Sequence, residues 1–183
     1  MDINGKKIYL TFDDGPHPTI TPFVLDILKQ NDAKATFFCI GNNVEKYPAV
    51  YELILEQGHS VGNHSFTHCN GYKTKDEQYL SDIEKAGHLI HSPLFRPPFG
   101  RLRSSQARQL KGHSIIMWDV LSGDFDESLN KKKCLKQTLD ATRPGSIIVF
   151  HDSDKAWQRV EYVLPRLMEK LKQRGYLFEK LTE

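Results

Sequence analysis

The sequence predicts an α/β fold in which parallel β-strands alternate with α-helices along the whole chain. Short runs of apolar and β-branched residues recur through the 183 residues, and segments with apolar residues at helical spacing lie between them. Parallel strands need a long crossover, usually a helix, so this alternation indicates right-handed β–α–β units. Such units build either an open sheet or a barrel.

Six short apolar runs are predicted as strands. They are residues 8–12, 35–40, 60–62, 94–95, 115–118 and 147–150, of which 94–95 is the shortest. Helices are predicted where apolar residues recur at helical spacing, at 23–28, 50–55, 79–90 and 160–171. Gly58 and Gly175 follow two of these helical segments at the position where a glycine commonly ends a helix.

Length and composition are those of one ordinary globular domain. Hydrophobic residues make up 39% of the chain and charged residues 26%, so we expect residues 1–183 to form a single domain with a sizeable core. The net charge of +2 gives no electrostatic reason to expect nucleic acid, and the lysines at 131–133 are expected at a solvated helix start. We therefore expect no nucleic-acid partner. The protein is also expected to be a monomer.

Membrane anchors, targeting signals and disulfides are not expected. Apolar runs fall short of the ~18 residues of a transmembrane helix, and residues 1–7 lack the apolar centre of a signal peptide. The sequence as it stands predicts a cytoplasmic protein without stable membrane insertion, unless an export segment lies outside it. Cys39, Cys69 and Cys134 are odd in number and widely spaced, which implies no disulfide framework.

Chemically active residues follow the predicted strands near the points where those strands end. These residues are Asp13 with Asp14, His64, Arg96, Asp124 and His151. In α/β barrels the carboxyl ends of the strands meet at one rim, where catalytic groups collect. We therefore expect these five positions along the chain to converge on a single site.

Asp14, His64 and His68 are the candidate metal ligands. His64 and His68 are four residues apart and would share one face of any helical turn, close enough to bind one cation. Two imidazoles and one carboxylate favour zinc, or cobalt and other late first-row divalent ions, over magnesium or calcium. A site of this kind with an open position generates hydroxide near neutral pH. Cys69 is a less favoured alternative ligand.

Asp13 precedes Asp14 and can have a different role, because neighbouring residues of a strand point to opposite sides if the strand continues. A turn at Asp-Gly-Pro would use one aspartate at most. Arg96 stands before two prolines and could hold Asp13 charged and oriented. The alternative for Arg96 is a surface arginine before a proline turn.

His151 ends an apolar run and is a candidate general acid, since an imidazole that binds no metal exchanges protons near pH 7. The alternative is a core histidine bonded to a main-chain carbonyl. Asp124 could orient His151 as a triad carboxylate does, with Asp119 and Asp126 as rivals for that role.

Five motifs together resemble those of polysaccharide deacetylases of the NodB-homology type, carbohydrate esterase family 4. In the family's order they are Thr11-Phe12-Asp13-Asp14-Gly15, His64-Ser65-Phe66-Thr67-His68, Arg96-Pro97-Pro98-Phe99-Gly100, Asp124-Phe125 and Ile148-Val149-Phe150-His151-Asp152. The resemblance covers nearly the whole chain, and it implies a distorted (β/α) barrel, usually of seven strands.

The resemblance also implies a role for each residue. It makes Asp13 the catalytic base, with Arg96 paired to it, and His151 the acid. It makes Asp14, His64 and His68 the ligands of one divalent metal, and it assigns an oxyanion donor to the main-chain N–H of Phe99. Phe99 replaces a tyrosine common in the family, which leaves that main-chain donor intact. Phe125 replaces the usual tryptophan, and Leu121 stands where many members carry another aspartate.

The expected reaction is hydrolysis of the N-acetyl group of a GlcNAc-type sugar in an acetylated glycan. Three alternatives stay open at this point. They are an esterase that removes O-acetyl groups from a carbohydrate, a hydrolase of cyclic amides on a related scaffold, and a metal-dependent glycan-binding module without catalysis. The family is mostly associated with the bacterial envelope.

Overall fold

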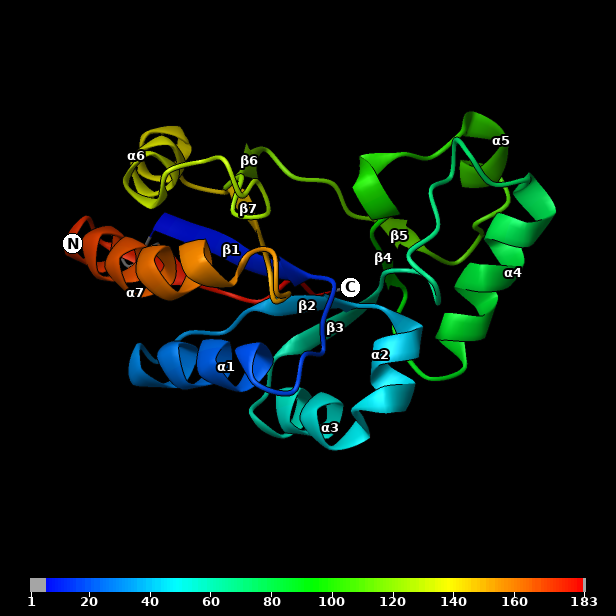
Figure 1. The fold of residues 1–183 in the computed structure, drawn as a ribbon, viewed down its shortest axis with the longest axis horizontal. Helices are drawn as coiled ribbons and strands as arrows, with labels where there is room; N and C mark the ends of the chain where they lie inside the picture. The colour runs from blue at the N-terminus through cyan, green and yellow to red at the C-terminus, as the bar shows by residue number, and fades with distance from the viewer. Residues whose placement is uncertain (1–5, 183) are drawn as a thin grey trace.

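Eight strands and seven α-helices alternate along residues 6–182, the part of the chain that the computed structural model describes (Figure 1). The strands are β1 (Lys6–Asp13), β2 (Thr36–Cys39), β3 (Ser60–Asn63), β4 (Leu94–Phe95), β5 (Ser114–Ile115), β6 (Val120–Leu121), β7 (Ile147–His151) and β8 (Tyr176–Phe178). Their pairings are all parallel, as the alternation of strands and helices predicts.

Seven of the strands form one curled sheet in the order β5-β4-β3-β2-β1-β7-β6, and the expected seven-stranded distorted barrel is confirmed. The eighth strand, β8, is an addition. It pairs with Lys6–Ile8, the first part of β1, whereas β7 pairs with Tyr9–Asp13 along the remainder. Since β2 flanks the other edge, β1 is held by three neighbours, and its last residue, Asp13, has a well-defined position.

The barrel is open between β5 and β6, the two ends of the strand order. The chain crosses this opening at residues 116–119. Ile116 donates its N–H to Phe95 of β4 at 2.8 Å, and Asp119 donates its N–H to Ile147 of β7 at 3.3 Å. The predicted strand at 115–118 is therefore too long, because this stretch leaves one edge of the sheet to reach the other.

The helices are α1 (Ile20–Gln30), α2 (Gly41–Lys46), α3 (Pro48–Glu56), α4 (Asp76–Gly87), α5 (Ser104–Ala107), α6 (Lys131–Ala141) and α7 (Trp157–Gln173). The four predicted helices correspond to α1, α3, α4 and α7, and the lysines at 131–133 begin α6. Sequence periodicity missed α2 and α5, which are too short to show it, and likewise the short strands β6 and β8. Gly58 and Gly175 follow α3 and α7 with φ of +76° and +80°, as expected for glycines that end helices.

The main hydrophobic core lies between β1 and the helices that pack on it. Ile8, Leu10 and Phe12 of β1 are fully buried. Phe12 stacks on Phe37 of β2 and Phe150 of β7, with ring centroids 5.1 and 6.0 Å apart. Six apolar residues of α7 are also fully buried: Val160, Val163, Leu164, Leu167, Met168 and Leu171. This packing makes the central strands a rigid base for the side chains at their ends.

Within residues 6–182, each helix is too short or too polar to cross a bilayer.

Candidate active site and metal centre

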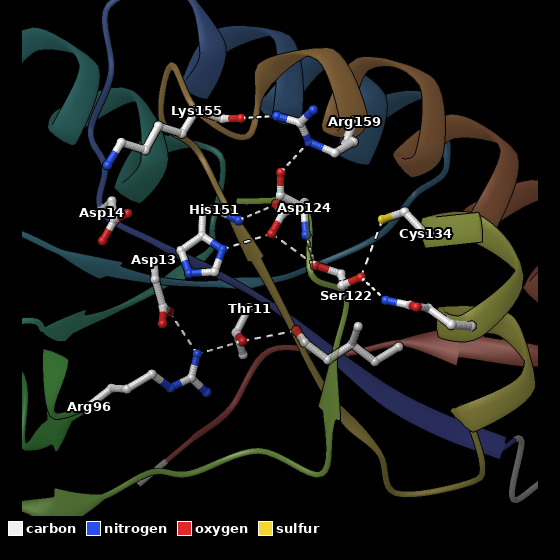
Figure 2. Close-up of polar contacts among 12 residues, drawn as sticks. Thr11, Asp13, Asp14, Arg96, Ser122, Asp124, Cys134, His151, Lys155 and Arg159 are labelled. Atoms are coloured by element: carbon white, nitrogen blue, oxygen red, sulfur yellow. Dashed lines mark hydrogen bonds and ion pairs between the residues drawn. The ribbon is translucent and has the colours of Figure 1, made fainter. Parts of the chain in front are cut away.

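The carboxyl ends of the strands bring the chemically active side chains together, and Figure 2 shows five of them: Asp13, Asp14, Arg96, Asp124 and His151. Asp13 and His151 end adjacent strands and are partners in the sheet register. His64 and Arg96 directly follow β3 and β4, which are neighbours as well. Asp124 lies three residues beyond β6 and contacts His151. The convergence expected from the strand ends is confirmed.

Asp14, His64 and His68 form the one group among residues 6–182 with the geometry of a metal site. One potential ligand atom from each residue lies within 4.8 Å of the other two. Asp14 Oδ1 is 3.7 Å from His64 Nε2 and 3.2 Å from His68 Nε2. This buried carboxylate oxygen has no hydrogen-bond partner in the described residues, although buried oxygens normally have one. A divalent cation would satisfy it, so the three residues fit such an ion.

His64 and His68 each direct their Nε2 atom toward Asp14. The Nδ1–H of His64 donates to the main-chain carbonyl of Arg96 at 2.7 Å, which leaves Nε2 facing Asp14. Burial, together with the nearby His64, lowers the pKa of His68 to about 4, although Asp14 opposes that shift. His68 is therefore uncharged at neutral pH, as metal binding requires.

The two histidines do not lie on a helical turn, contrary to the expectation from their spacing. Residues 64–68 form an irregular loop after β3, and Ser65 and His68 have φ of +61° and +57°. The rings still approach to 5.1 Å between centroids. Asp82 of α4 stabilises the loop, since its carboxylate accepts the main-chain N–H groups of Phe66 and Thr67 at 2.9 and 3.0 Å.

Left-handed backbone is concentrated in this site. Five described non-glycine residues have positive φ, and four of them are Asp14, Ser65, His68 and Phe99. Asp14 has φ of +81°, so β1 stops at Asp13 and the next side chain turns toward the histidines. Opposite sides were expected only if the strand continued through Asp14, and that condition is not met. Such conformations cost about 1–3 kcal/mol each and are typical of functional sites.

Asp13 is buried and paired with Arg96, whose Nη1 lies 2.7 Å from Asp13 Oδ1. Burial alone would raise the pKa of Asp13, but Arg96, His64 and His151 outweigh it, and the pKa lies below its ordinary value. The same Nη1 donates to Thr11 Oγ1 at 2.7 Å. Asp13 is therefore an ionised carboxylate at neutral pH.

Arg96 is fully buried, so the alternative of a surface arginine is wrong. Its guanidinium carbon lies 4.0 Å from the ring centroid of Phe38, and its Nε donates to the carbonyl of Ile116 at 3.2 Å. Ile116 begins the segment that crosses the open side of the barrel. Arg96 thus joins the strand ends to that segment while it holds Asp13.

His151 and Asp124 are joined by two hydrogen bonds. The Nδ1–H of His151 donates to Asp124 Oδ1 at 2.8 Å, and its main-chain N–H donates to Oδ2 at 2.7 Å. Burial would lower the pKa of His151, but the carboxylates of Asp124, Asp13 and Asp14, with Asp124 contributing most, outweigh burial and raise it to about 9. The rival carboxylates are elsewhere: Asp119 accepts hydrogen bonds from Ser146 and Ile147, and Asp126 from Ser128.

Two phenylalanines border the site. The ring of Phe99 lies 4.5 Å from the His68 ring and is 59% exposed, and the ring of Phe125 lies 5.1 Å from the His151 ring and is 43% exposed. Single exposed aromatic rings are unremarkable on a protein surface, but here each one covers an ionisable group. They give the site an apolar rim.

Sequence reasoning missed Thr11, Asp82 and Asp152. Thr11 opens the first motif but was given no role, and it accepts a hydrogen bond from Arg96. Asp82 supports the histidine loop, and nothing local in the sequence distinguishes it. Asp152 is fully buried, and burial raises its pKa to about 8. Its position beside His151 was the available signal. Cys69 lies outside the ligand group, since its thiol donates to Asp82 at 3.3 Å and burial raises its pKa to about 11.

A family model described as polysaccharide deacetylase matches residues 2–115. Among curated proteins, a peptidoglycan-N-acetylglucosamine deacetylase of Bacillus cereus is 32% identical over 188 residues, which cover 98% of this chain and 88% of the relative. A chitooligosaccharide deacetylase of Azorhizobium caulinodans is 35% identical over 161 residues, which cover 81% of this chain and 75% of the relative.

A solved structure has nearly the same fold. It is a peptidoglycan N-acetylglucosamine deacetylase in complex with 4-naphthalen-1-yl-N-oxidanyl-benzamide. Its TM-score against this chain is 0.90 at 32% sequence identity, and the match covers 97% of this chain and 87% of that one.

Proposed function

This chain belongs to the polysaccharide deacetylase family, and from that membership we propose that it hydrolyses the N-acetyl group of GlcNAc-type sugars with Asp13 as base and His151 as acid. The family's reaction breaks the carbon–nitrogen bond of a linear amide. The finer assignment concerns the sugar, the metal and the role of each residue.

The opposite pKa shifts of Asp13 and His151 carry this proposal. Two titratable groups that face each other with pKa values displaced in opposite directions are the pattern of an acid–base pair. The pKa of Asp13 lies below its ordinary value and that of His151 is about 9. At neutral pH the carboxylate is ready to accept a proton and the imidazolium is ready to donate one.

Asp14, His64 and His68 would hold a divalent cation beside this pair. Two nitrogen donors and one carboxylate favour zinc, with cobalt and other late first-row ions as alternatives. When bound there, the cation acts as a Lewis acid that polarises the acetyl carbonyl and lowers the pKa of water.

The residues of the chain divide the proton transfers between them. Asp13 accepts a proton from the water that attacks the acetyl carbonyl, while Arg96 keeps the carboxylate oriented. The main-chain N–H of Phe99 donates to the oxyanion, a contribution of about 3–4 kcal/mol for a preorganised donor. His151, oriented by Asp124, protonates the amine nitrogen as the carbon–nitrogen bond breaks. The products are a free amine and acetate.

The pairing of Asp13 with His151 supports catalysis, because a module that only binds glycans would not need a base and an acid side by side. The names of the relatives support an N-acetylated glycan as substrate, either peptidoglycan or chitooligosaccharide. The apolar rings of Phe99 and Phe125 are suited to the face of a sugar or to an acetyl methyl group.

Acetate release is the direct test. The metal-stripped protein would be incubated with N-acetylated chitin oligomers, with and without added zinc or cobalt, and with O-acetylated xylan in parallel. Acetate that appears from the oligomers only after metal is restored would support the proposal. Release from xylan alone would identify an O-acetyl esterase, and release without metal would exclude the role given to Asp14, His64 and His68.

A further inference from the structure

Arg159 is a buried arginine in the first turn of α7 that contacts the proposed acid pair from behind (Figure 2). Its Nε–H donates to the main-chain carbonyl of Asp124 at 2.6 Å, and its Nη2 donates to the carbonyl of Lys155. In the described part of the chain these are its two hydrogen bonds, and no carboxylate forms an ion pair with it.

Burial of the Arg159 guanidinium without a carboxylate partner among the described residues costs folding free energy, which points to a role beyond packing. A buried cation loses its hydration, and the hydrogen bonds from Arg159 to two carbonyls offset only part of that loss in free energy. The first turn of a helix is also the end at which the helix dipole disfavours positive charge. Packing alone would be served at lower cost by an apolar side chain of similar length.

Every polar atom of Asp124, the residue that Arg159 contacts, takes part in a hydrogen bond. Asp124 is fully buried, and its N–H donates to Ser122 Oγ at 3.2 Å. Its Oδ1 accepts from Ser122 and His151, and its Oδ2 accepts from the main-chain N–H of His151. The remaining polar atom, the main-chain carbonyl oxygen of Asp124, accepts the hydrogen bond from Arg159. Asp124 is thus immobilised on every side.

The turn that carries Asp124 depends on outside support. Gly123 has φ of +77°, so the chain reverses sharply just before the aspartate. From α6, Gln137 donates to the carbonyl of Ser122 at 2.7 Å, and Arg159 of α7 binds the carbonyl two residues further on. Because β6 has only two residues, these two helices supply much of what holds the turn.

We propose that Arg159 is a positioning residue of the acid: its guanidinium holds the main chain of Asp124 so that the carboxylate keeps both hydrogen bonds to His151. This inference rests on the proposed function, since it concerns how His151 is kept ready to donate a proton.

The pKa of His151 reports this role without any assay of activity. The charged groups that face His151 are Asp124, Asp13 and Asp14, with His68 across the site. Loss of the Asp124 contact lowers the pKa of His151. Removal of the positive charge of Arg159, taken alone, would raise it instead. The direction of the shift therefore separates positioning from a simple charge effect.

The test compares Arg159→Met, Arg159→Lys and a matched control, Arg166→Met. Arg166 lies on the same helix and donates to the carbonyl four residues before it, as Arg159 does, but it is exposed and contacts no residue of the site. Arg159→Lys keeps the charge without the planar donor group, and it provides a milder variant if Arg159→Met does not fold. The His151 signal is assigned in NMR spectra by comparison with His151→Gln.

In metal-free protein, we expect both Arg159 variants to lower the pKa of His151 by about one unit or more, and Arg166→Met to leave it unchanged. In metal-loaded protein, kcat should fall about 10- to 100-fold in the Arg159 variants with little change in KM. A His151 pKa that stays constant or rises in the folded variants would overturn the proposal. Failure of the wild type to release acetate would contradict the proposed function instead, and the NMR comparison would still decide the role of Arg159.

Discussion

The ionisation states of Asp13 and His151 are set by the residues around them. Both are buried, and burial by itself would drive each of them toward its neutral form. Arg96 keeps Asp13 ionised, and Asp124 keeps His151 protonated. The proposed base and the proposed acid are therefore in opposite ionisation states at the same pH.

Replacement of Asp13 by asparagine should remove the base and leave the metal ligands in place. We expect turnover to fall about 10²- to 10⁴-fold, the usual contribution of a general base, with zinc affinity nearly unchanged by calorimetric titration. Because Arg96 loses its carboxylate partner, the unfolding temperature has to be measured as well. Wild-type turnover in a folded Asp13→Asn protein would exclude Asp13 as the base.

Replacement of His64 by alanine should have the complementary effect. Loss of one of three ligands should abolish tight zinc binding, and acetate release should be lost with it. His88, which is exposed and outside the ligand group, provides the control, and His88→Ala should bind zinc like the wild type. Unchanged zinc affinity in His64→Ala would show that the ligand set is wrong.

The pH dependence of the acid follows from the raised pKa of His151. Its pKa of about 9 in the folded protein lies above the ordinary histidine value of about 6.5, so the imidazolium persists at neutral pH and is lost as the pH rises through about 9. NMR titration of metal-free protein should give this value, and Asp124→Asn should move it down toward 6.5. A wild-type value near 6.5 would contradict the pairing with Asp124.

At the scale of elements, the end of β1 depends on close contact with the end of β7. Gly15 lies directly against the carboxyl group of Asp152, and the Asp152 N–H donates to the carbonyl of Asp13 at 3.1 Å. A Cβ atom at position 15 would overlap that carboxyl group. The glycine therefore allows the two strand ends to meet, and the proposed base and acid come from these two ends.

Gly15→Ala tests this contact between the strand ends. We expect the variant to lose about 1–3 kcal/mol of stability through overpacking, and to lose activity because Asp13 and Asp14 shift with the backbone. Gly87→Ala is the control, since its Cβ would meet only Asn63, at 3.9 Å, and should not destabilise the protein. Urea unfolding and acetate release would be measured for both. Equal stability in the two variants would contradict a structural need for glycine at position 15.

At the scale of the whole molecule, the positions of the site residues depend on the packing of the hydrophobic core beneath the strands. The buried face of α7 packs under the central strands, and the same helix carries Arg159 at its first turn. Packing of this helix therefore affects both the stability of the sheet and the position of Asp124.

Truncation within that core should reduce global stability. Leu167→Ala removes a fully buried side chain and should cost about 2–5 kcal/mol, or roughly 2–4 °C in unfolding temperature for each kcal/mol. Leu177→Ala provides the matched control, because Leu177 is 49% exposed and its truncation should cost less than about 0.5 kcal/mol. Similar losses in the two variants would show that α7 is not part of the main core.

Much of the fold could be predicted because strand and helix signals are local. The runs at 8–12 and 147–150 identify β1 and β7 to within a few residues, and their ends locate Asp13 and His151. The crossing at 116–119 could not be predicted, since an apolar run resembles a strand whether or not a partner strand lies beside it. The strands β6 and β8 were missed because two or three residues are too few to show a strand pattern.

The sequence by itself determined which residues are candidates for the chemistry: an aspartate and two histidines proposed for a metal, a second aspartate and a third histidine proposed for proton transfer, and the strand ends that carry them. Residue type and strand position are properties of local segments. Only the tertiary structure decided which carboxylate meets His151, how residues 64–68 fold, and that Arg159 reaches Asp124. These contacts join segments far apart in the chain, and their geometry depends on packing that no local pattern encodes.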